Sequence, residues 1–214
     1  MIQKMEYEVI ASSSKGNATI LNSILVDCGV PYKYLQPNVK KIGLVLLTHE
    51  HGDHFNRTTI KRLATERPTL RFGSSDYLVQ KLCECGVNMR NIDVIEAGSI
   101  YDYGFCKLES FSLVHNVPNI GWKIYFENGE KALYATDTNR IDHVRAKDFS
   151  YYFIEANYTE AEIVERIRSK QESGKHVYEW DVLENHLSRE KAENWLYQNM
   201  GANSQYVLLH EHED

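Results

Sequence analysis

Short runs of apolar residues, separated by turn-forming residues, dominate the first quarter of the chain. Residues 7–11 and 18–21 have the composition of short strands, and the Ser, Lys, Gly and Asn residues of 12–17 form a turn between them. Residues 24–29 predict a third strand. Residues 42–47, IGLVLL, are apolar without interruption, as expected of a strand covered on both faces. The pattern therefore predicts a strand meander followed by a buried strand.

Helical periodicity begins beyond residue 55. Ile60, Leu63 and Ala64 recur at helical spacing, which predicts a helix over residues 56–67. A second helix is predicted over residues 74–86, because Gly86 can adopt the left-handed conformation that often ends a helix. Further along the chain the pattern predicts strands over residues 106–115, 121–128, 131–137 and 151–157, a helix over 188–200 ended by Gly201, and a last strand over 206–210.

Sheets with helices in both halves indicate an α/β layered fold. The 214 residues suffice for a self-sufficient core, and no repeat or linker divides them, so we expect a single domain over residues 1–214. The beginning of the chain carries no long apolar run, which predicts a cytoplasmic protein without a membrane segment. Cys28, Cys83, Cys85 and Cys106 lack the paired spacing of a structural zinc site and are expected to be reduced thiols.

The formal net charge of −6 limits the class of partner. Nucleic-acid affinity comes largely from Lys and Arg side chains that replace condensed counterions, so a long nucleic-acid groove is disfavoured, although a local basic patch stays open. The 14 tyrosines indicate either amphipathic packing or a subunit interface, which would make the protein a homodimer.

The densest group of chemically active residues follows the predicted buried strand. Residues 45–55, VLLTHEHGDHF, place His49, His51, Asp53 and His54 within six positions. Neutral imidazoles and carboxylates are ligands of zinc, manganese and iron. A polar loop whose histidines cap a helix is the alternative, but the density of ligand-type side chains favours a metal site.

The run HEHGDH resembles the H-x-H-x-D-H signature of the metallo-β-lactamase superfamily. The resemblance implies a four-layer αββα fold, with metals at the rim between two sheets. Residues 12–21 and 25–29 resemble the opening of the branch that contains the YycJ-type proteins and the ribonuclease Z and J enzymes. In that branch the aspartate of the second stretch, here Asp27, supports the ligand loop.

The same resemblance implies further ligands at strand ends downstream. His115, Asp137 and His210 each follow an apolar stretch, in the order that the superfamily requires. By resemblance, His49, His51 and His115 hold one metal, Asp53, His54 and His210 hold the other, and Asp137 bridges them. His212, two residues beyond His210, is an alternative last ligand. The implied cofactors are two divalent transition-metal ions, with zinc favoured and manganese as the alternative.

Residues 184–196 resemble the segment in which a histidine donates a proton to the leaving group, which makes His186 the candidate general acid. Two alternatives stay open: His186 is itself a metal ligand, or it merely precedes a helix capped by Ser188. Glu155 occupies the position that supports this donor in the ribonuclease branch. The sequence departs from its relatives nearby, because Ile154 and Tyr158 stand where ribonuclease Z and YycJ-like proteins, respectively, have histidines.

A dinuclear centre of this type activates water as hydroxide, with Asp53 orienting the water as well as binding metal, so the predicted reaction is hydrolysis. Phosphodiesters are the favoured substrates. The alternatives are a DNA or RNA nuclease of the YycJ type and a lactone or other acyl ester hydrolase. Residues 116–136 and 138–209 are too few for the tRNA-gripping arm of ribonuclease Z or the inserted domain of ribonuclease J. We therefore expect a small nucleotide or a nucleic-acid end as substrate. The chain is also similar in size and motif to a compact, phage-encoded branch of the superfamily whose members cleave cyclic mononucleotides.

Overall fold

The computed structural model describes residues 4–211, and the chain divides into two compact units, Met1–Ser110 and Phe111–Asp214. The boundary between the units falls within one strand, β8 (Cys106–Leu113). Among residues 4–211, no helix combines the length and apolar character needed to cross a membrane.

The first sheet confirms the predicted meander and buried strand. It contains, in spatial order, β1 (Tyr7–Ser13), β2 (Gly16–Leu21), β3 (Ile24–Val26), β4 (Leu44–Leu46), β5 (Arg71–Ser74) and β6 (Ile92–Val94). Strands β1 to β3 pair antiparallel, whereas β3 to β6 pair parallel. Parallel neighbours end at the same edge of a sheet, so the residues that follow β3 and β4 come together there.

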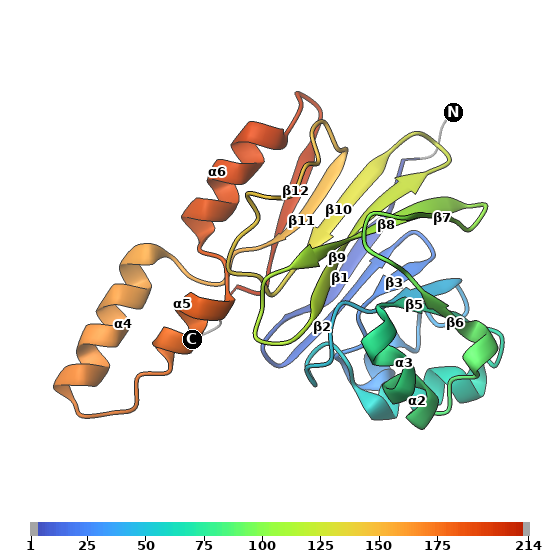
Figure 1. The fold of residues 1–214 in the computed structure, drawn as a ribbon, viewed down its shortest axis with the longest axis horizontal. Helices are drawn as coiled ribbons and strands as arrows, with labels where there is room; N and C mark the ends of the chain where they lie inside the picture. The colour runs from blue at the N-terminus through green and yellow to red at the C-terminus, as the bar shows by residue number, and fades with distance from the viewer. Residues whose placement is uncertain (1–3, 212–214) are drawn as a thin grey trace. The chain divides into compact units, whose positions relative to one another are not determined.

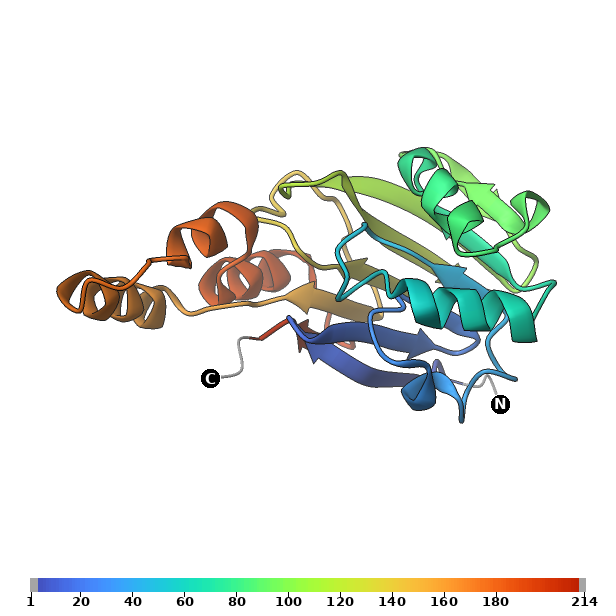
Figure 2. The same ribbon diagram turned by 90° about the horizontal axis from the view of Figure 1, so that it is seen from below.

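Three α-helices accompany this sheet: α1 (Tyr32–Leu35), α2 (Arg57–Glu66) and α3 (Val79–Glu84). Figures 1 and 2 show α2 and α3 beside the strands of the first unit, and their apolar residues join one core with β4 and β5. The predicted helix over residues 56–67 is confirmed. The predicted helix over 74–86 is a 3₁₀ turn, η1 (Asp76–Leu78), that continues into α3, and Gly86 has the expected positive φ of 86°.

The second sheet has the order β12-β11-β10-β9-β8-β7. Its strands not yet delimited are β7 (Ile100–Asp102), β9 (Asn119–Phe126), β10 (Lys131–Ala135), β11 (Tyr151–Glu155) and β12 (Gln205–Leu209). Strands β10, β11 and β12 are parallel neighbours. Their carboxyl ends therefore bring Asp137, Glu155 and His210 to one edge of this sheet.

The helices of the second unit are α4 (Glu160–Glu172), α5 (Glu179–Asn185) and α6 (Arg189–Asn199). Helix α6 packs on β11 in the main core of the unit, as Figure 1 shows, whereas α4 and α5 pack on each other. The α4–α5 pair has a small apolar cluster of its own, built around Tyr158, Ile163 and Ile167. This satellite cluster lies next to the residues that follow β11.

Candidate functional site

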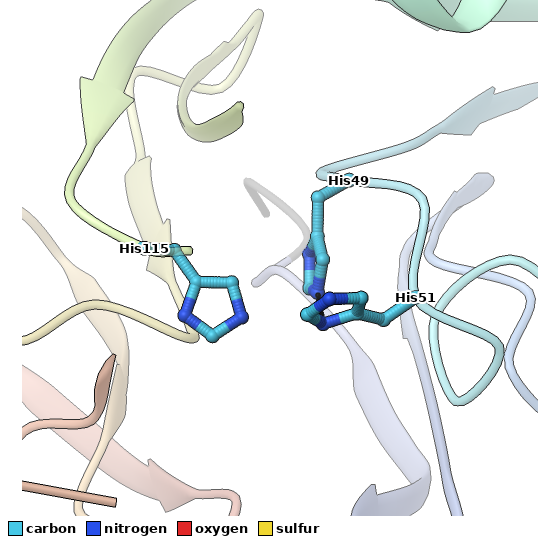
Figure 3. Close-up of side chains that lie close together, drawn as sticks. All are labelled: His49, His51 and His115. Carbon is cyan, nitrogen blue, oxygen red and sulfur yellow. Dashed lines mark hydrogen bonds between the residues drawn. The ribbon is translucent and has the colours of Figure 1, made fainter. Parts of the chain in front are cut away.

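The loop after β4 gathers the ligand-type residues of the first unit. Nε2 of His49 lies 3.2 Å from Nδ1 of His51, and the ring centroids of His49 and His54 are 4.2 Å apart. Oδ2 of Asp53 lies 3.5 Å from Nε2 of His54. His49 and His54 are buried, while His51 and Asp53 are part-exposed. Figure 3 shows the rings of His49 and His51 against each other. The spacing HEHGDH thus brings together four side chains of the types that can bind a metal ion.

Asp27, at the end of β3, lies buried beneath this loop. Its carboxylate accepts the backbone N–H of Thr48 at 2.9 Å and contacts Nδ1 of His54 at 2.7 Å. Oγ1 of Thr48 bridges Asp27 and Nδ1 of His49, at 3.0 Å from each. Burial raises the pKa of Asp27, and the favourable interaction with His54 opposes that rise only in part. The network fixes the rotation of two imidazoles, which is how residues behind a metal site orient its ligands.

Asn17 in β2 and Gly29 after β3 both lie against the ligand loop. The backbone N–H of Asn17 donates to the carbonyl of Asp53 at 2.7 Å, and its side-chain amide lies 2.8 Å from Nε2 of His54. A Cβ atom on Gly29 would overlap the same Asp53 carbonyl. Only glycine therefore permits this close approach of backbone to backbone. Metal binding through Nε2 of His54 requires the Asn17 amide to turn away from that atom.

Glu50 lies inside the motif but takes no part in this cluster. Its carboxylate forms an ion pair with Lys81 of α3. The ligand-type chemistry of the loop is thus limited to His49, His51, Asp53 and His54, as the resemblance to the superfamily implies.

His115 follows β8 in the second unit and is drawn in Figure 3. Nδ1 of His115 donates to the carbonyl oxygen of Asn185, at the end of α5, over 3.1 Å. A carbonyl can only accept, so this bond places the ring hydrogen on Nδ1 and leaves the lone pair of Nε2 available to a metal ion when the ring is neutral. Nε2 of His115 lies 4.0 Å from Oδ1 of Asp137.

Asp137, after β10, is held from both sides. Thr136 donates its hydroxyl to Oδ2 at 2.7 Å, and the side-chain amide of Asn119 donates to the backbone carbonyl of Asp137 at 2.7 Å. Oδ1 faces the histidines of the unit, 3.7 Å from Nδ1 of His210 and 3.8 Å from Nδ1 of His186. The carboxylate is thus oriented with one oxygen toward the hydroxyl and the other toward imidazoles.

The backbone is strained at three of the aspartate and histidine residues described above. Asp27, Asp137 and His210 have φ values of 62°, 55° and 54°, a region that residues other than glycine rarely adopt. Each follows the end of a parallel strand. Strained backbone of this kind persists where the surrounding structure holds it, and it gathers at functional sites.

His210 is buried after β12, where Asn157 holds it. The Asn157 side-chain amide donates to the His210 carbonyl at 3.0 Å and lies 3.3 Å from Nδ1. His212, the alternative last ligand, lies outside the residues that the structure describes.

Nδ1 of His186 lies 2.5 Å from Oε1 of Glu155, whose carboxylate is completely buried at the end of β11. Burial alone would lower the pKa of His186, but the Glu155 carboxylate and, beyond it, Asp137 raise it above its usual value. Burial alone would likewise raise the pKa of Glu155, and the interaction with His186 holds it below its usual value. The pair therefore favours a protonated imidazole beside an ionised carboxylate. Ser188 also caps α6 by accepting from the Lys191 N–H, so the cap and the His186–Glu155 pair coexist.

The donor chemistry of both units fits divalent metal ions. In the second unit, ligand atoms of Asp137, Glu155, His186 and His210 all lie within 4.8 Å of one another. In the first unit the ligand-type atoms are imidazole nitrogens and a carboxylate oxygen. Imidazoles and carboxylates backed by hydrogen-bond partners are the usual surroundings of zinc and related metals.

The chain belongs to the β-lactamase superfamily, because the model of the beta-lactamase superfamily domain matches residues 22–210. Together with the two mixed sheets and their helices, this match confirms the predicted α/β metallo-β-lactamase fold. The protein is thus a hydrolase of this superfamily, whose members typically bind divalent metals.

Individual relatives agree with this assignment. The chain is 22% identical over 198 residues to exodeoxyribonuclease YycJ of Bacillus anthracis, a match that covers 86% of this chain and 71% of that protein. It is similar in structure to the metallo-β-lactamase fold protein YhfI of Bacillus subtilis, with a TM-score of 0.77, 17% identity and coverage of 99% of this chain and 89% of the other. It is also similar to the short form of human tRNase Z, with a TM-score of 0.68, 15% identity and coverage of 97% and 92%.

The supporting residues were harder to predict than the ligands. In the sequence, Asn17 suits a hairpin turn and a contact to a substrate phosphate equally well, and no pattern gives a role to Thr48, Asn157 or Asn185. The available signals were local: Thr48 directly precedes the first histidine, and Asn157 comes two residues after Glu155. Asn185 acts through its carbonyl oxygen, which no side-chain pattern can indicate.

Proposed function

We propose that the protein is a dinuclear metal-dependent phosphodiesterase that acts on small nucleotides, cyclic ones included. The observation that carries the proposal is a set of side chains with metal-ligand chemistry, several of which are oriented by a hydrogen-bond partner. Asp27 contacts His54, Asn185 contacts His115, and Thr136 contacts Asp137. We assign His49, His51 and His115 to one metal, Asp53, His54 and His210 to the other, and Asp137 to both. Zinc is the favoured ion and manganese the alternative, given imidazole and carboxylate ligands.

Bound divalent ions would supply the positive charge that polarises a phosphoryl oxygen and lowers the pKa of water. The residues of the chain divide the remaining tasks. Asp53, whose side chain is 22% exposed, is the carboxylate that accepts a hydrogen bond from the attacking water. His186 holds its Nδ1 proton toward Glu155, so the proton on Nε2 is the one available to the leaving-group oxygen.

Charge and chain length favour a small substrate. The net charge of −6 opposes an extended polyanion. Residues 138–209 form β11, β12 and helices α4 to α6 of the second unit itself, so this stretch carries no inserted domain among the described residues. A mononucleotide or the end of a nucleic acid therefore fits better than a long duplex.

A nuclease is the second candidate, and the similarity to a protein named exodeoxyribonuclease favours it. An acyl ester or lactone hydrolase is the third, because the same metal chemistry serves those substrates. The three candidate enzymes differ in the bond that they cleave. They also differ in how strongly their substrate affinity depends on salt, because each phosphate that a nuclease contacts makes its affinity fall more steeply as the salt concentration rises.

A hydrolysis panel on metal-replete protein tests the proposal. It would contain bis-p-nitrophenyl phosphate, cyclic mononucleotides, a 20-mer DNA, tRNA and lactones, with metal content measured alongside. We expect about two ions per chain, turnover of the phosphodiesters and little change of KM between low and physiological salt. Lactone turnover without phosphodiester turnover contradicts the proposal, and a faster, strongly salt-dependent reaction on the 20-mer favours the nuclease instead.

A further inference from the structure

The second unit contains a hollow of about 450 Å³ that is distinct from the cluster of ligand-type side chains. This volume lies within the range of roughly 300–1,000 Å³ that is usual for small-molecule sites. The hollow is formed by the loop after β11, the first two turns of α4, the start of α6 and the residue after His210. Its polar lining includes Asn157, Thr159, Glu162, Arg166, Arg189 and Glu211.

The hollow adjoins a residue assigned to the metals. Asn157 lines it and also donates to the carbonyl of His210 at 3.0 Å. Glu211, which follows His210 in the chain, lines it as well. The hollow is therefore lined by one residue that contacts His210 and by another that follows it in the chain.

The charges of the lining do not suit a phosphate. Three carboxylates, Glu162, Glu165 and Glu211, face two guanidinium groups, Arg166 and Arg189. Arg189 is already paired with Glu193 and Glu211, at 3.2 Å and 3.5 Å. A net negative lining repels an anion. It suits a neutral ligand edge that offers both hydrogen-bond donors and acceptors.

Arg166 and Glu162 supply adjacent complementary groups. They are four residues apart on α4 and so lie on the same face of the helix. Arg166 lines the hollow, but its Nε is buried, so the terminal N–H groups of the guanidinium are the donors left for a ligand there. One oxygen of Glu162 accepts from the hydroxyl of Thr159 at 2.7 Å, which fixes the carboxylate at the N-terminus of α4. A donor and an acceptor are thus held side by side in the hollow.

We infer that the hollow binds the guanine base of the nucleotide substrate. Guanine has the acceptor O6 beside two donors, N1–H and N2–H, so it can accept from an arginine while donating twice to a carboxylate. Thymine has only one donor, N3–H, beside its acceptor O4, and adenine has no carbonyl acceptor on this edge. The inference rests on the proposed phosphodiesterase function for its role, because a base held here leaves the attached phosphate to the metals. The pair of Arg166 and Glu162 determines specificity and does not take part in the chemical step.

The test uses substrates that share one leaving group. These are the p-nitrophenyl esters of guanosine, adenosine and thymidine 5′-phosphates, with bis-p-nitrophenyl phosphate as the substrate without a base. We expect the guanosine ester to have a kcat/KM at least ~10-fold above the other nucleoside esters, the order of discrimination that one good base contact gives. Arg166→Ala and Glu162→Gln should each raise KM for the guanosine ester ~10-fold and leave bis-p-nitrophenyl phosphate unchanged.

Arg168→Ala is the matched control. Arg168 lies on the same helix, its side chain is 67% exposed, and it pairs with Glu165 and Glu172 on the surface. Arg168 does not line the hollow. Its partner Glu165 does, but the loss of one exposed ion pair should leave kcat/KM unchanged for both the guanosine ester and bis-p-nitrophenyl phosphate. Equal kcat/KM for all three nucleoside esters, or an equal loss on the ester and on bis-p-nitrophenyl phosphate in the variants, overturns the inference.

Calorimetric binding of guanosine to the metal-free protein separates this inference from the proposed function. Guanosine has no phosphate, so its binding does not depend on hydrolysis. Binding of guanosine but not adenosine, lost in Arg166→Ala and kept in Arg168→Ala, supports the hollow as a guanine site even if no phosphodiester is cleaved. Absence of guanosine binding to the wild-type protein overturns the inference even if phosphodiesters are cleaved.

Discussion

Glu155 fixes the orientation of His186 through a contact of 2.5 Å between Oε1 and Nδ1, while its other oxygen, Oε2, accepts the backbone N–H of Thr138 at 2.7 Å. The carboxylate is fully buried, so its charge acts on the imidazole with little screening. This pair links the end of β11 to the segment between α5 and α6. It is the arrangement that a positioned proton donor requires.

Glu155→Gln should therefore slow hydrolysis without removing the donor. The amide keeps the shape of the side chain but loses the charge that favours protonated His186, and we expect kcat to fall roughly 10- to 100-fold, the usual effect of a residue behind a reacting group. A substrate with a p-nitrophenolate leaving group needs little protonation and should be affected less than a natural nucleotide. Glu184→Gln, at an exposed position of α5, is the control and should leave kcat unchanged.

Asp53→Ala and His186→Ala should impair metal binding and hydrolysis in different ways. Asp53 is assigned to a metal and to the attacking water, so its loss should reduce metal content and activity together. His186→Ala should keep the metals and slow hydrolysis by ~10² to 10⁴-fold, the usual contribution of a positioned acid. Metal analysis by mass spectrometry, measured beside kcat, separates the two. Loss of metal from His186→Ala would make His186 a ligand and would put the assignment of His210 in question.

Sequence patterns predicted β1 to β4 and β8 to β12, because these strands are apolar runs with clear turns between them. They did not predict β5, β6 and β7, whose sequences RFGS, IDV and IYD contain no continuous apolar run. Residues 24–29 and 42–47 contain β3 and β4, and the parallel pairing of these strands brings Asp27 beneath the histidine loop. The pairing itself is a long-range contact that periodicity does not reveal. The resemblance implied a supporting role for Asp27, but the contacts of Thr48 with Asp27 and of Asn17 with His54 could be identified only in the structure.

Helices α4 and α5 were not predicted from the sequence, for a physical reason. In α4 only Ile163 and Ile167 are buried, and in α5 only Glu179 is, so neither helix has the wide apolar stripe that signals an amphipathic helix. They are stabilised by each other and by the capping of α4 by Thr159. Because these helices were not predicted, the hollow lined by Glu162 and Arg166 could not be predicted either.

Asp27→Asn should weaken metal binding although Asp27 is not assigned to any metal. The carboxylate orients His54 directly and His49 through Thr48, so we expect metal affinity to fall roughly 10- to 100-fold. Glu50→Gln is a matched control within the motif, since Glu50 pairs with Lys81 instead. Competition with a fluorescent chelator measures both variants. Equal losses of affinity would show that general destabilisation, rather than the contact with His54, is responsible.

Gly29→Ala should destabilise the first unit and disturb the ligand loop. The added Cβ overlaps the carbonyl of Asp53, so the backbone must move, at a cost of about 1–3 kcal/mol in the free energy of unfolding. Gly43→Ala is the control, because its Cβ would meet no atom closer than 3.8 Å. Urea unfolding of both variants, together with their metal content, tests the prediction. A Gly29→Ala protein with unchanged stability and full metal content would contradict it.

The α4–α5 pair should have a stability that depends on pH through Glu179. The Glu179 carboxylate is buried and pairs with Lys170 of α4 at 2.6 Å. Burial alone would raise the pKa of Glu179, but the hydrogen bond from Lys170 and further favourable contacts hold it below its usual value of 4.5. A carboxyl group whose pKa is lower in the folded state adds stability above its unfolded pKa, and that stability is lost as the pH falls through the folded pKa.

Lys170→Met tests this dependence by removing the partner and leaving Glu179 buried. At neutral pH the opening free energy of α4 and α5 should fall by roughly 1–3 kcal/mol, the cost of leaving a buried charged group without its hydrogen bond. The difference from the wild-type protein should shrink as the pH falls below 4.5, because the Glu179 carboxylate then becomes neutral in the variant. Native-state hydrogen exchange, corrected for intrinsic rates at each pH, resolves α4 and α5 from the main core, since these helices have an apolar cluster of their own. Arg168→Met removes only exposed ion pairs, so its opening free energy should not differ from that of the wild-type protein in a pH-dependent way. If the loss of opening free energy in Lys170→Met does not change with pH, Glu179 is not the cause of that loss.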